Sequence, residues 1–124
     1  MAGRLHVDNP VVNAHDLIVY RVVLRDQPAI VDLVHTVLSP LVQARGGAAP
    51  LIDTLEAHFD TGGVATESAK RLHVSVRTVT NRLHRVKVLT GYNPSDAADR
   101  FALQPAVLGA KALNWPQEPL PVPG

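Results

Sequence analysis

The chain has 124 residues, a length typical of one domain, and 46% of them are hydrophobic while 19% are charged, as in folded globular proteins. It has no cysteine, which excludes a disulfide framework, a zinc site with thiolate ligands and a cysteine nucleophile. No apolar run approaches the roughly 18–20 residues of a membrane span, and the first ten residues lack the apolar core of a secretory signal. The composition therefore predicts a cytoplasmic protein without a membrane partner.

Charge is distributed unevenly along the chain, although the formal net charge is only +1. Residues 64–90 carry six lysines and arginines against a single glutamate, a net charge of +5. Residues 1–63 carry −3 and residues 91–124 carry −1. One block of positive charge in an otherwise nearly neutral chain favours a polyanionic partner.

The first part of the chain is expected to hold an arm and one helix. Residues 16–24 are rich in β-branched and aromatic side chains, which favours a strand. A lone strand leaves its backbone groups unpaired, so we expect residues 1–27 to be an N-terminal arm or the remnant of an upstream domain. After Pro28, apolar residues recur at three- and four-residue spacing. This spacing predicts a connecting or dimerisation helix within residues 28–47, bent or interrupted near Pro40.

Residues 48–114 are expected to form the main domain. Pro50 suits the first turn of a helix, which the glycine pair at residues 62–63 would end. A short helix follows at about residues 65–73. The pattern predicts an all-α fold, a helical bundle that contains a helix–turn–helix and no winged element.

Two further helices complete this expected domain. Ser75 is a suitable N-cap for a helix that ends at Gly91, and Asp96 or Ser95 would cap the last helix, with Pro105 as a kink. The apolar residues expected on the inner face of the last helix are Phe101, Leu103, Val107, Leu108 and Leu113. Residues 115–124 contain four prolines, which predicts an extended, flexible tail.

The segment 65–90 has the pattern of a helix–turn–helix. Ala69 supplies the small residue needed where the two helices cross, and the turn between the helices is three residues long. The apolar anchors on the two helices are Leu72, Val74, Val79 and Leu83. In such a motif the second helix presents its outer face to the major groove of DNA.

Polar residue types on this second helix suit contacts with DNA. Val79 is taken to face the core, and successive residues of a helix are rotated by about 100°. On this basis the predicted base contacts on the outer face are Arg77, Thr80, Asn81 and His84. Arginine can form a bidentate bond with guanine, and asparagine can do the same with adenine. Hydroxyl and basic side chains at the helix start and flank suit phosphates. The predicted phosphate contacts are Lys70, Arg71, Ser75, Thr78, Arg82 and Arg85.

Matches to a known pattern are spread over several of these elements. They are LIDTLEAHF at residues 51–59, GG at 62–63, AKRLHV at 69–74, TV at 78–79, RL at 82–83, LTG at 89–91 and DRFAL at 99–103. Together they resemble the C-terminal helix–turn–helix domain of the PucR/CdaR family of bacterial transcriptional regulators. The resemblance covers roughly residues 50–113.

The resemblance implies sequence-specific binding of double-stranded DNA in transcriptional regulation, usually at the output end of a longer protein with sensory domains upstream. The chain departs from the family pattern at Val64, at residues 75–78 and at Thr80 and Asn81. The scaffold is therefore similar while the reading face differs, which implies a different operator. One recognition helix at about residues 75–90 reads only a few base pairs, so a homodimer on two half-sites is expected. The segments 16–24 and 29–43 are candidates for its interface.

Two alternatives come from other classes of protein. The first is a dimerisation or protein-interaction module that keeps the fold and binds operator DNA weakly or not at all, as the departures at residues 76, 80 and 81 would allow. The second is a small enzyme, for which no convergent set of titratable groups can be assembled. The six histidines lack the ligand spacing of a metal site. We therefore expect no enzymatic activity, no metal and no cofactor.

Overall fold

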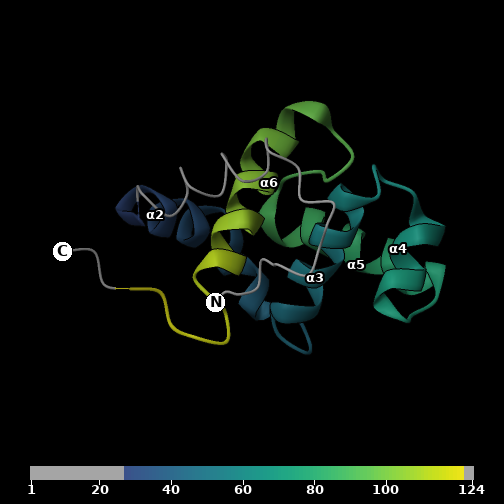
Figure 1. Cartoon of the computed structure of the whole chain (residues 1–124), viewed down its shortest axis with the longest axis horizontal. Coiled ribbons are helices and arrows are strands. Elements are labelled where there is room, and N and C mark those ends of the chain that lie inside the picture. The colour runs from purple at the N-terminus through teal and green to yellow at the C-terminus, as the bar shows by residue number, and fades with distance from the viewer. Residues whose placement is uncertain (1–26, 122–124) are drawn as a thin grey trace, which may run out of the picture.

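The computed structural model describes residues 27–121 of the chain. Within this range the regular structure consists of five α-helices and one 3-10 helix, with no strand (Figure 1). They are α2 (Gln27–Leu38), η1 (Ser39–Gln43), α3 (Ala49–Asp60), α4 (Ala65–Leu72), α5 (Val76–Thr90) and α6 (Ala97–Ala112). The predicted all-α bundle is confirmed. The strand-like arm predicted at residues 16–24 lies outside the described residues.

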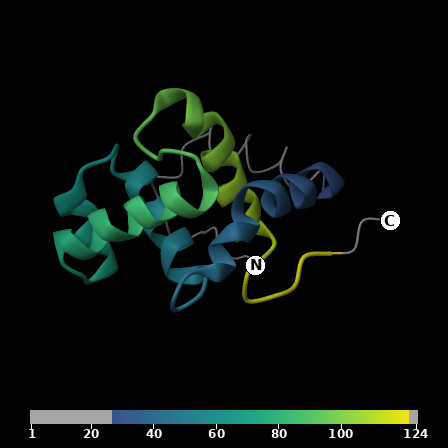
Figure 2. The same cartoon turned by 180° about the vertical axis from the view of Figure 1, so that it is seen from behind.

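The hydrophobic core lies where α2, η1, α3, α5 and α6 meet. Its largest fully buried apolar side chains are Leu38, Leu41, Ile52, Leu55 and Leu103. α6 runs beside α2 at one end of the molecule, and α4 and α5 lie at the other end (Figures 1 and 2). α3 lies between them and contacts α4, α5 and α6. The core therefore joins the α4–α5 pair to the rest of the bundle through α3 and through a direct contact between α5 and η1.

A glycine allows α2 and α6 to approach closely. A Cβ atom added at Gly109 of α6 would lie 2.6 Å from Cγ2 of Ile30 and 3.1 Å from Cγ2 of Val34, both on α2. These distances are shorter than an ordinary carbon–carbon contact of about 3.5–4.0 Å. The absence of a side chain at this position is what lets the two helices pack at this separation.

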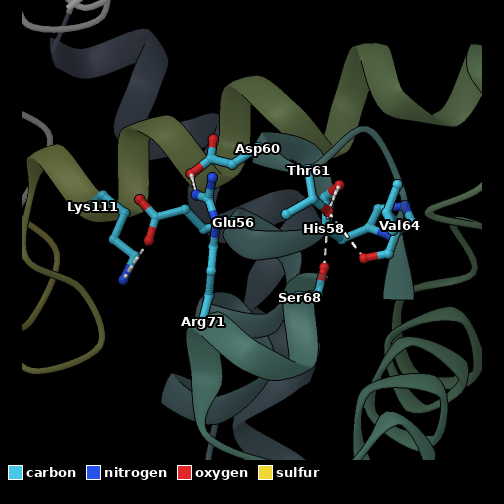
Figure 3. A network of polar contacts seen from close by, with 8 residues as sticks. All are labelled: Glu56, His58, Asp60, Thr61, Val64, Ser68, Arg71 and Lys111. Carbon is cyan, nitrogen blue, oxygen red and sulfur yellow. Dashed lines mark hydrogen bonds and ion pairs between the residues drawn. The ribbon is translucent and has the colours of Figure 1, made fainter. Parts of the chain in front are cut away.

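An ion-pair cluster connects α6 to α3 on the surface. Lys111 Nζ contacts Oδ1 of Asp53 and lies 3.4 Å from Oε1 of Glu56; Figure 3 draws Lys111 beside Glu56. Burial disfavours the charged form of Lys111, but the two carboxylates outweigh it and raise the pKa of Lys111 above its usual value. The cluster therefore keeps a positive charge on α6 next to α3.

The helix boundaries follow the caps and breakers in the sequence. Pro40 falls where α2 gives way to η1, which confirms the interruption predicted within residues 28–47. Asp96 is the N-cap of α6, because its Oδ1 accepts hydrogen bonds from the backbone N–H of Ala98 (2.7 Å) and of Asp99 (3.4 Å). α6 continues through Pro105.

One residue expected in the core lies on the surface. Phe101 is 85% exposed, whereas Leu103 and Val107 are buried as predicted. At about 100° per residue, Phe101 lies about 160° around α6 from Leu103. The prediction that Phe101 faces inward was wrong because an apolar residue type was given more weight than its position on the helix.

The tail was also expected to be solvated from residue 115 onward, and Trp115 differs from this expectation. Asn114 has a φ of +56°. Its backbone N–H donates to the carbonyl of Lys111 (3.2 Å), and the backbone N–H of Trp115 donates to the carbonyl of Ala110 (2.8 Å). These two bonds form a Schellman motif at the end of α6. The motif turns the chain back, so that Trp115 is only 8% exposed and Leu120 packs against the core.

Candidate nucleic-acid interface

The turn between α4 and α5 is built by the backbone. His73 has a φ of +57°, in the left-handed region. The backbone N–H of Val74 donates to the carbonyl of Ala69 (3.1 Å), and that of His73 donates to the carbonyl of Lys70 (3.3 Å). This is a second Schellman motif, with His73 at the position where glycine is most common. It ends α4 and sends the chain directly into α5.

Replacing His73 by glycine is expected to stabilise the fold by about 0.5–1 kcal/mol. The left-handed conformation costs a residue with a side chain roughly 1–2 kcal/mol, and glycine avoids this cost. The greater conformational freedom of glycine in the unfolded chain reduces the resulting gain in stability by about 0.5–1 kcal/mol. Chemical denaturation measures the change. His73→Ala is the matched control, because it removes the imidazole and keeps the backbone cost. Equal stability of the two variants would contradict the explanation.

The start of α5 is capped by its predicted N-cap residue. Oγ of Ser75 accepts a hydrogen bond from the backbone N–H of Thr78 (3.1 Å) and lies 3.0 Å from Oγ1 of Thr78. Gly91, with a φ of +81°, ends the helix. Both boundaries expected for this helix are confirmed. The two hydroxyls predicted to contact phosphate are therefore held together at the first turn of α5.

The outer face of α5 is polar and open. Val79 and Val86 are fully buried on its inner face, while Arg77, Asn81 and His84 are exposed. Between residues 27 and 121, these three side chains take part in no hydrogen bond or ion pair. Spacings of four and three residues place them in one row along the helix. Their donors and acceptors are thus available to an external partner.

Thr80 shares this exposed face but uses its hydroxyl internally. Its Oγ1 donates to the carbonyl of Arg77, 3.0 Å away. This bond occupies the hydroxyl proton and leaves the oxygen lone pairs and the methyl group for a partner.

The predicted phosphate contacts on α4 are paired with acids in the free protein. Nζ of Lys70 lies 3.8 Å from Oε2 of Glu67, and Nη1 of Arg71 lies 3.6 Å from Oδ2 of Asp60. Figure 3 shows Arg71 reaching from α4 to Asp60. All four side chains are more than half exposed, and such pairs contribute only about 0–1 kcal/mol. A phosphate group could therefore replace the acid at little cost.

The predicted contacts on the flank of α5 face a groove. Asn81, Arg82 and Arg85 line one side of it, and the turn between η1 and α3, which includes Arg45, lines the other. Arg82 is half-buried, and its Nη1 donates to Oγ1 of Thr54 (3.4 Å), whereas Arg85 is exposed. Arg45 was not predicted from the sequence to be a site residue. The one signal for it was its position directly before a glycine pair and the start of a helix.

A pair of hydroxyls holds α4 against the end of α3. The hydroxyl of Ser68, which is fully buried, lies 2.9 Å from that of Thr61. The Thr61 hydroxyl in turn lies 3.3 Å and 3.4 Å from the carbonyl oxygens of His58 and Val64 (Figure 3). The burial of Ser68 was not predicted, because a lone serine on a helix carries no signal of burial. This network fixes the first helix of the motif in place.

His58 connects α3 to the loop before α6. It is buried, and its Nε2 lies 3.3 Å from the carbonyl oxygen of Pro94. Burial lowers the pKa of His58 below its usual value of 6.5; the Pro94 carbonyl opposes this shift and the nearby Arg100 adds to it. The imidazole is therefore harder to protonate in the folded than in the unfolded protein.

Stability is expected to fall as the pH is lowered from about 7.5 to about 5.5, because the unfolded chain takes up a proton at His58 near pH 6.5 while the folded protein resists it. The decline should level off below the folded pKa. Urea denaturation across this pH range measures the change. His58→Gln is expected to have a flatter profile whatever its absolute stability. Equal slopes in the two proteins would show that His58 does not cause the dependence.

The fold and this surface together define a helix–turn–helix domain, a class of DNA-binding domain. The family model of the PucR C-terminal helix-turn-helix domain matches residues 51–108. Residues 51–108 therefore form a PucR-type helix–turn–helix, which is a DNA-binding regulatory domain. The resemblance stated from the sequence is confirmed.

Two curated relatives are similar to the chain over most of its length. They are "Uncharacterized protein Rv2242" of Mycobacterium tuberculosis and "Uncharacterized protein Mb2266" of Mycobacterium bovis, each 35% identical over 116 residues. These residues make up 94% of this chain and 27% of each relative. The chain thus spans about a quarter of the length of these relatives. No solved structure matches it.

Neither a membrane span nor a metal centre is found in the described residues. Among residues 27–121, no helix is long and apolar enough to cross a membrane. The same part of the chain has no group of three or more histidine or acidic side chains arranged to hold a metal ion.

Proposed function

We propose that this domain binds DNA in a sequence-specific manner, with α5 in the major groove, as part of a bacterial transcriptional regulator. The observation that carries the proposal is the outer face of α5. Arg77, Asn81 and His84 are exposed there without partners in the described chain, while Val79 and Val86 anchor the opposite face in the core. Side chains of these types can read base edges by hydrogen bonding, and the family match over residues 51–108 supports the assignment.

The proposed contacts divide into two sets. Arg77, Asn81 and His84 read bases, together with the methyl group and oxygen of Thr80. Basic and hydroxyl groups around them hold the sugar–phosphate backbone and set the register of the protein on the duplex. This second set consists of Lys70, Arg71, Ser75, Thr78, Arg82 and Arg85.

The proposal includes a homodimer. A single recognition helix reads only a few base pairs, and two copies on half-sites about one helical turn apart would supply useful affinity and specificity. Residues 28–47 are the proposed connecting and dimerisation segment. The protein acts in the cytoplasm, and it needs no cofactor and no chemistry of its own for this role.

Selection from a pool of random duplexes tests the proposal. The chain is expected to enrich one common sequence. Its affinity should fall with salt at a log–log slope of about −0.9 for each phosphate contacted. A protein-interaction module would enrich no sequence and would bind duplex weakly even at low salt. That pair of results would contradict the proposal.

A further inference from the structure

The groove beside α5 gathers three arginines from two separate parts of the fold. It has a volume of about 540 Å³, and its lining includes Arg45 from the turn between η1 and α3 together with Arg82 and Arg85 from α5. The remaining lining residues are Ala44, Gly46, Gly47, Pro50, Leu51 and Asn81. None of the lining residues is acidic. The groove therefore concentrates positive charge with no counter-charge in its own wall.

The rest of the described chain does not neutralise these arginines. Within residues 27–121, neither Arg45 nor Arg85 forms an ion pair, and the one recorded partner of Arg82 is the uncharged hydroxyl of Thr54. Lys70, Arg71 and Lys111 do pair with acids. Three like charges around one groove repel one another, and an anion placed between them would relieve that repulsion.

Two glycines determine where Arg45 lies. Gly46 and Gly47 have φ values of +89° and +84°, a region that other residues enter only at a cost. The backbone N–H of Gly47 donates to the carbonyl of Ala44 (2.9 Å), which closes the turn. Residues of this turn and of α5 line the same groove. The local backbone therefore holds Arg45 across the groove from the arginines of α5.

Asn81 joins the groove to the reading face of α5. It lines the groove and also belongs to the exposed row with Arg77 and His84. When a helix lies in the major groove, the sugar–phosphate strands pass along its flanks, and basic side chains there contact phosphates. A groove on the flank of α5 that touches the reading face has the position and the charge for a backbone phosphate.

We propose that this groove binds a phosphodiester of the DNA backbone, with Arg45 as a phosphate contact supplied from outside the helix–turn–helix. The inference rests on the proposed DNA binding and deepens it. It makes the turn between η1 and α3 part of the interface. It also gives the hydrogen bond from Arg82 to the neutral hydroxyl of Thr54 a positioning role, because this bond holds one guanidinium at the wall of the groove.

Arg45→Gln tests the inference on the full chain. The variant removes one positive charge, and the side chain of Arg45 forms no hydrogen bond or ion pair within residues 27–121, so the thermal stability of the variant should match that of the parent. Its affinity for random duplex is expected to fall roughly fivefold at low salt, with a log–log salt slope shallower by about 0.9. The base preference found by duplex selection should be the same as that of the parent.

Arg100→Gln is the matched control for the loss of one charge. Arg100 lies on α6, with its guanidinium carbon 5.7 Å from the centre of the Phe59 ring, and it does not line the groove. Its salt slope should equal that of the parent. If Arg45→Gln and Arg100→Gln both keep the slope of the parent while the parent selects one sequence, the groove does not bind phosphate, although the DNA-binding proposal stands.

Two further outcomes would also overturn the inference, for different reasons. A changed base preference in Arg45→Gln would mean that Arg45 reads bases and does not hold the backbone. A parent chain that binds no duplex at low salt would remove the proposed function itself and the phosphate subsite with it. The salt slope and the selected sequence of the parent distinguish these cases.

Discussion

Replacing Arg77 by alanine is expected to lower the affinity for the preferred duplex by about 1–3 kcal/mol, or roughly five- to 150-fold, and to relax the base preference at one position. The reason is the location of Arg77 in the first turn of α5 on the exposed face, where its guanidinium can form two hydrogen bonds to one guanine. No partner within residues 27–121 competes for it. Fluorescence anisotropy with the selected duplex and with single-base variants measures both effects.

Arg77→Lys separates the geometry of the contact from its charge. Lysine keeps the positive charge and loses the planar fork that matches a base edge. The lysine variant should therefore bind random duplex like the parent and lose part of its preference at the one base position that Arg77 reads. If Arg77→Ala left both the preferred sequence and its affinity unchanged, the assignment of the reading face would be wrong.

The helix limits were the most predictable part of the structure, because local signals determine them. The hydroxyl of Ser75 can satisfy a free N–H at the start of α5, and Gly91 can adopt the positive φ at its end, so α5 begins and ends as expected. The same holds for Asp96 at the start of α6. The exposure of the four predicted base contacts on α5 also followed from helical periodicity, with Val79 as the inward reference.

Features that depend on how segments pack in the folded chain were not predictable in this way. Trp115 is buried because an asparagine in the left-handed conformation turns the chain back over the core. Ser68 is buried because Thr61, on the other side of a turn, supplies a hydroxyl. Arg45 reaches the flank of α5 only because the bundle places two separate segments beside one groove. No local pattern of residues contains these pairings.

The buried face of α3 was predictable as an apolar stripe, but its position between three other helices was not. α3 contacts α4, α5 and α6, and Leu55 at its centre is completely buried. α4 depends on its contacts with α3 and α5, since it supplies no side chain to the main hydrophobic cluster, whereas α5 supplies Val86. The attachment of the α4–α5 pair to the bundle therefore depends in part on the core around α3.

Replacing Leu55 by alanine is consequently expected to cost about 2–5 kcal/mol of unfolding free energy, because the deleted methyl groups leave a cavity that close-packed neighbours fill only in part. A typical domain has about 5–15 kcal/mol in total, so the variant should have a much lower denaturation midpoint with a similar denaturant slope. Val88→Ala on α5 is the control, because Val88 is 58% exposed and its loss should change stability by no more than about 0.5 kcal/mol. A cost below about 1 kcal/mol for Leu55→Ala would mean that the site collapses freely and that α3 is not the central packing element.

Below its denaturation midpoint, the folded Leu55→Ala protein should still select the same DNA sequence, since no base contact has been removed. Changed selection would instead show that the packing of α3 sets the direction in which α5 presents its outer face.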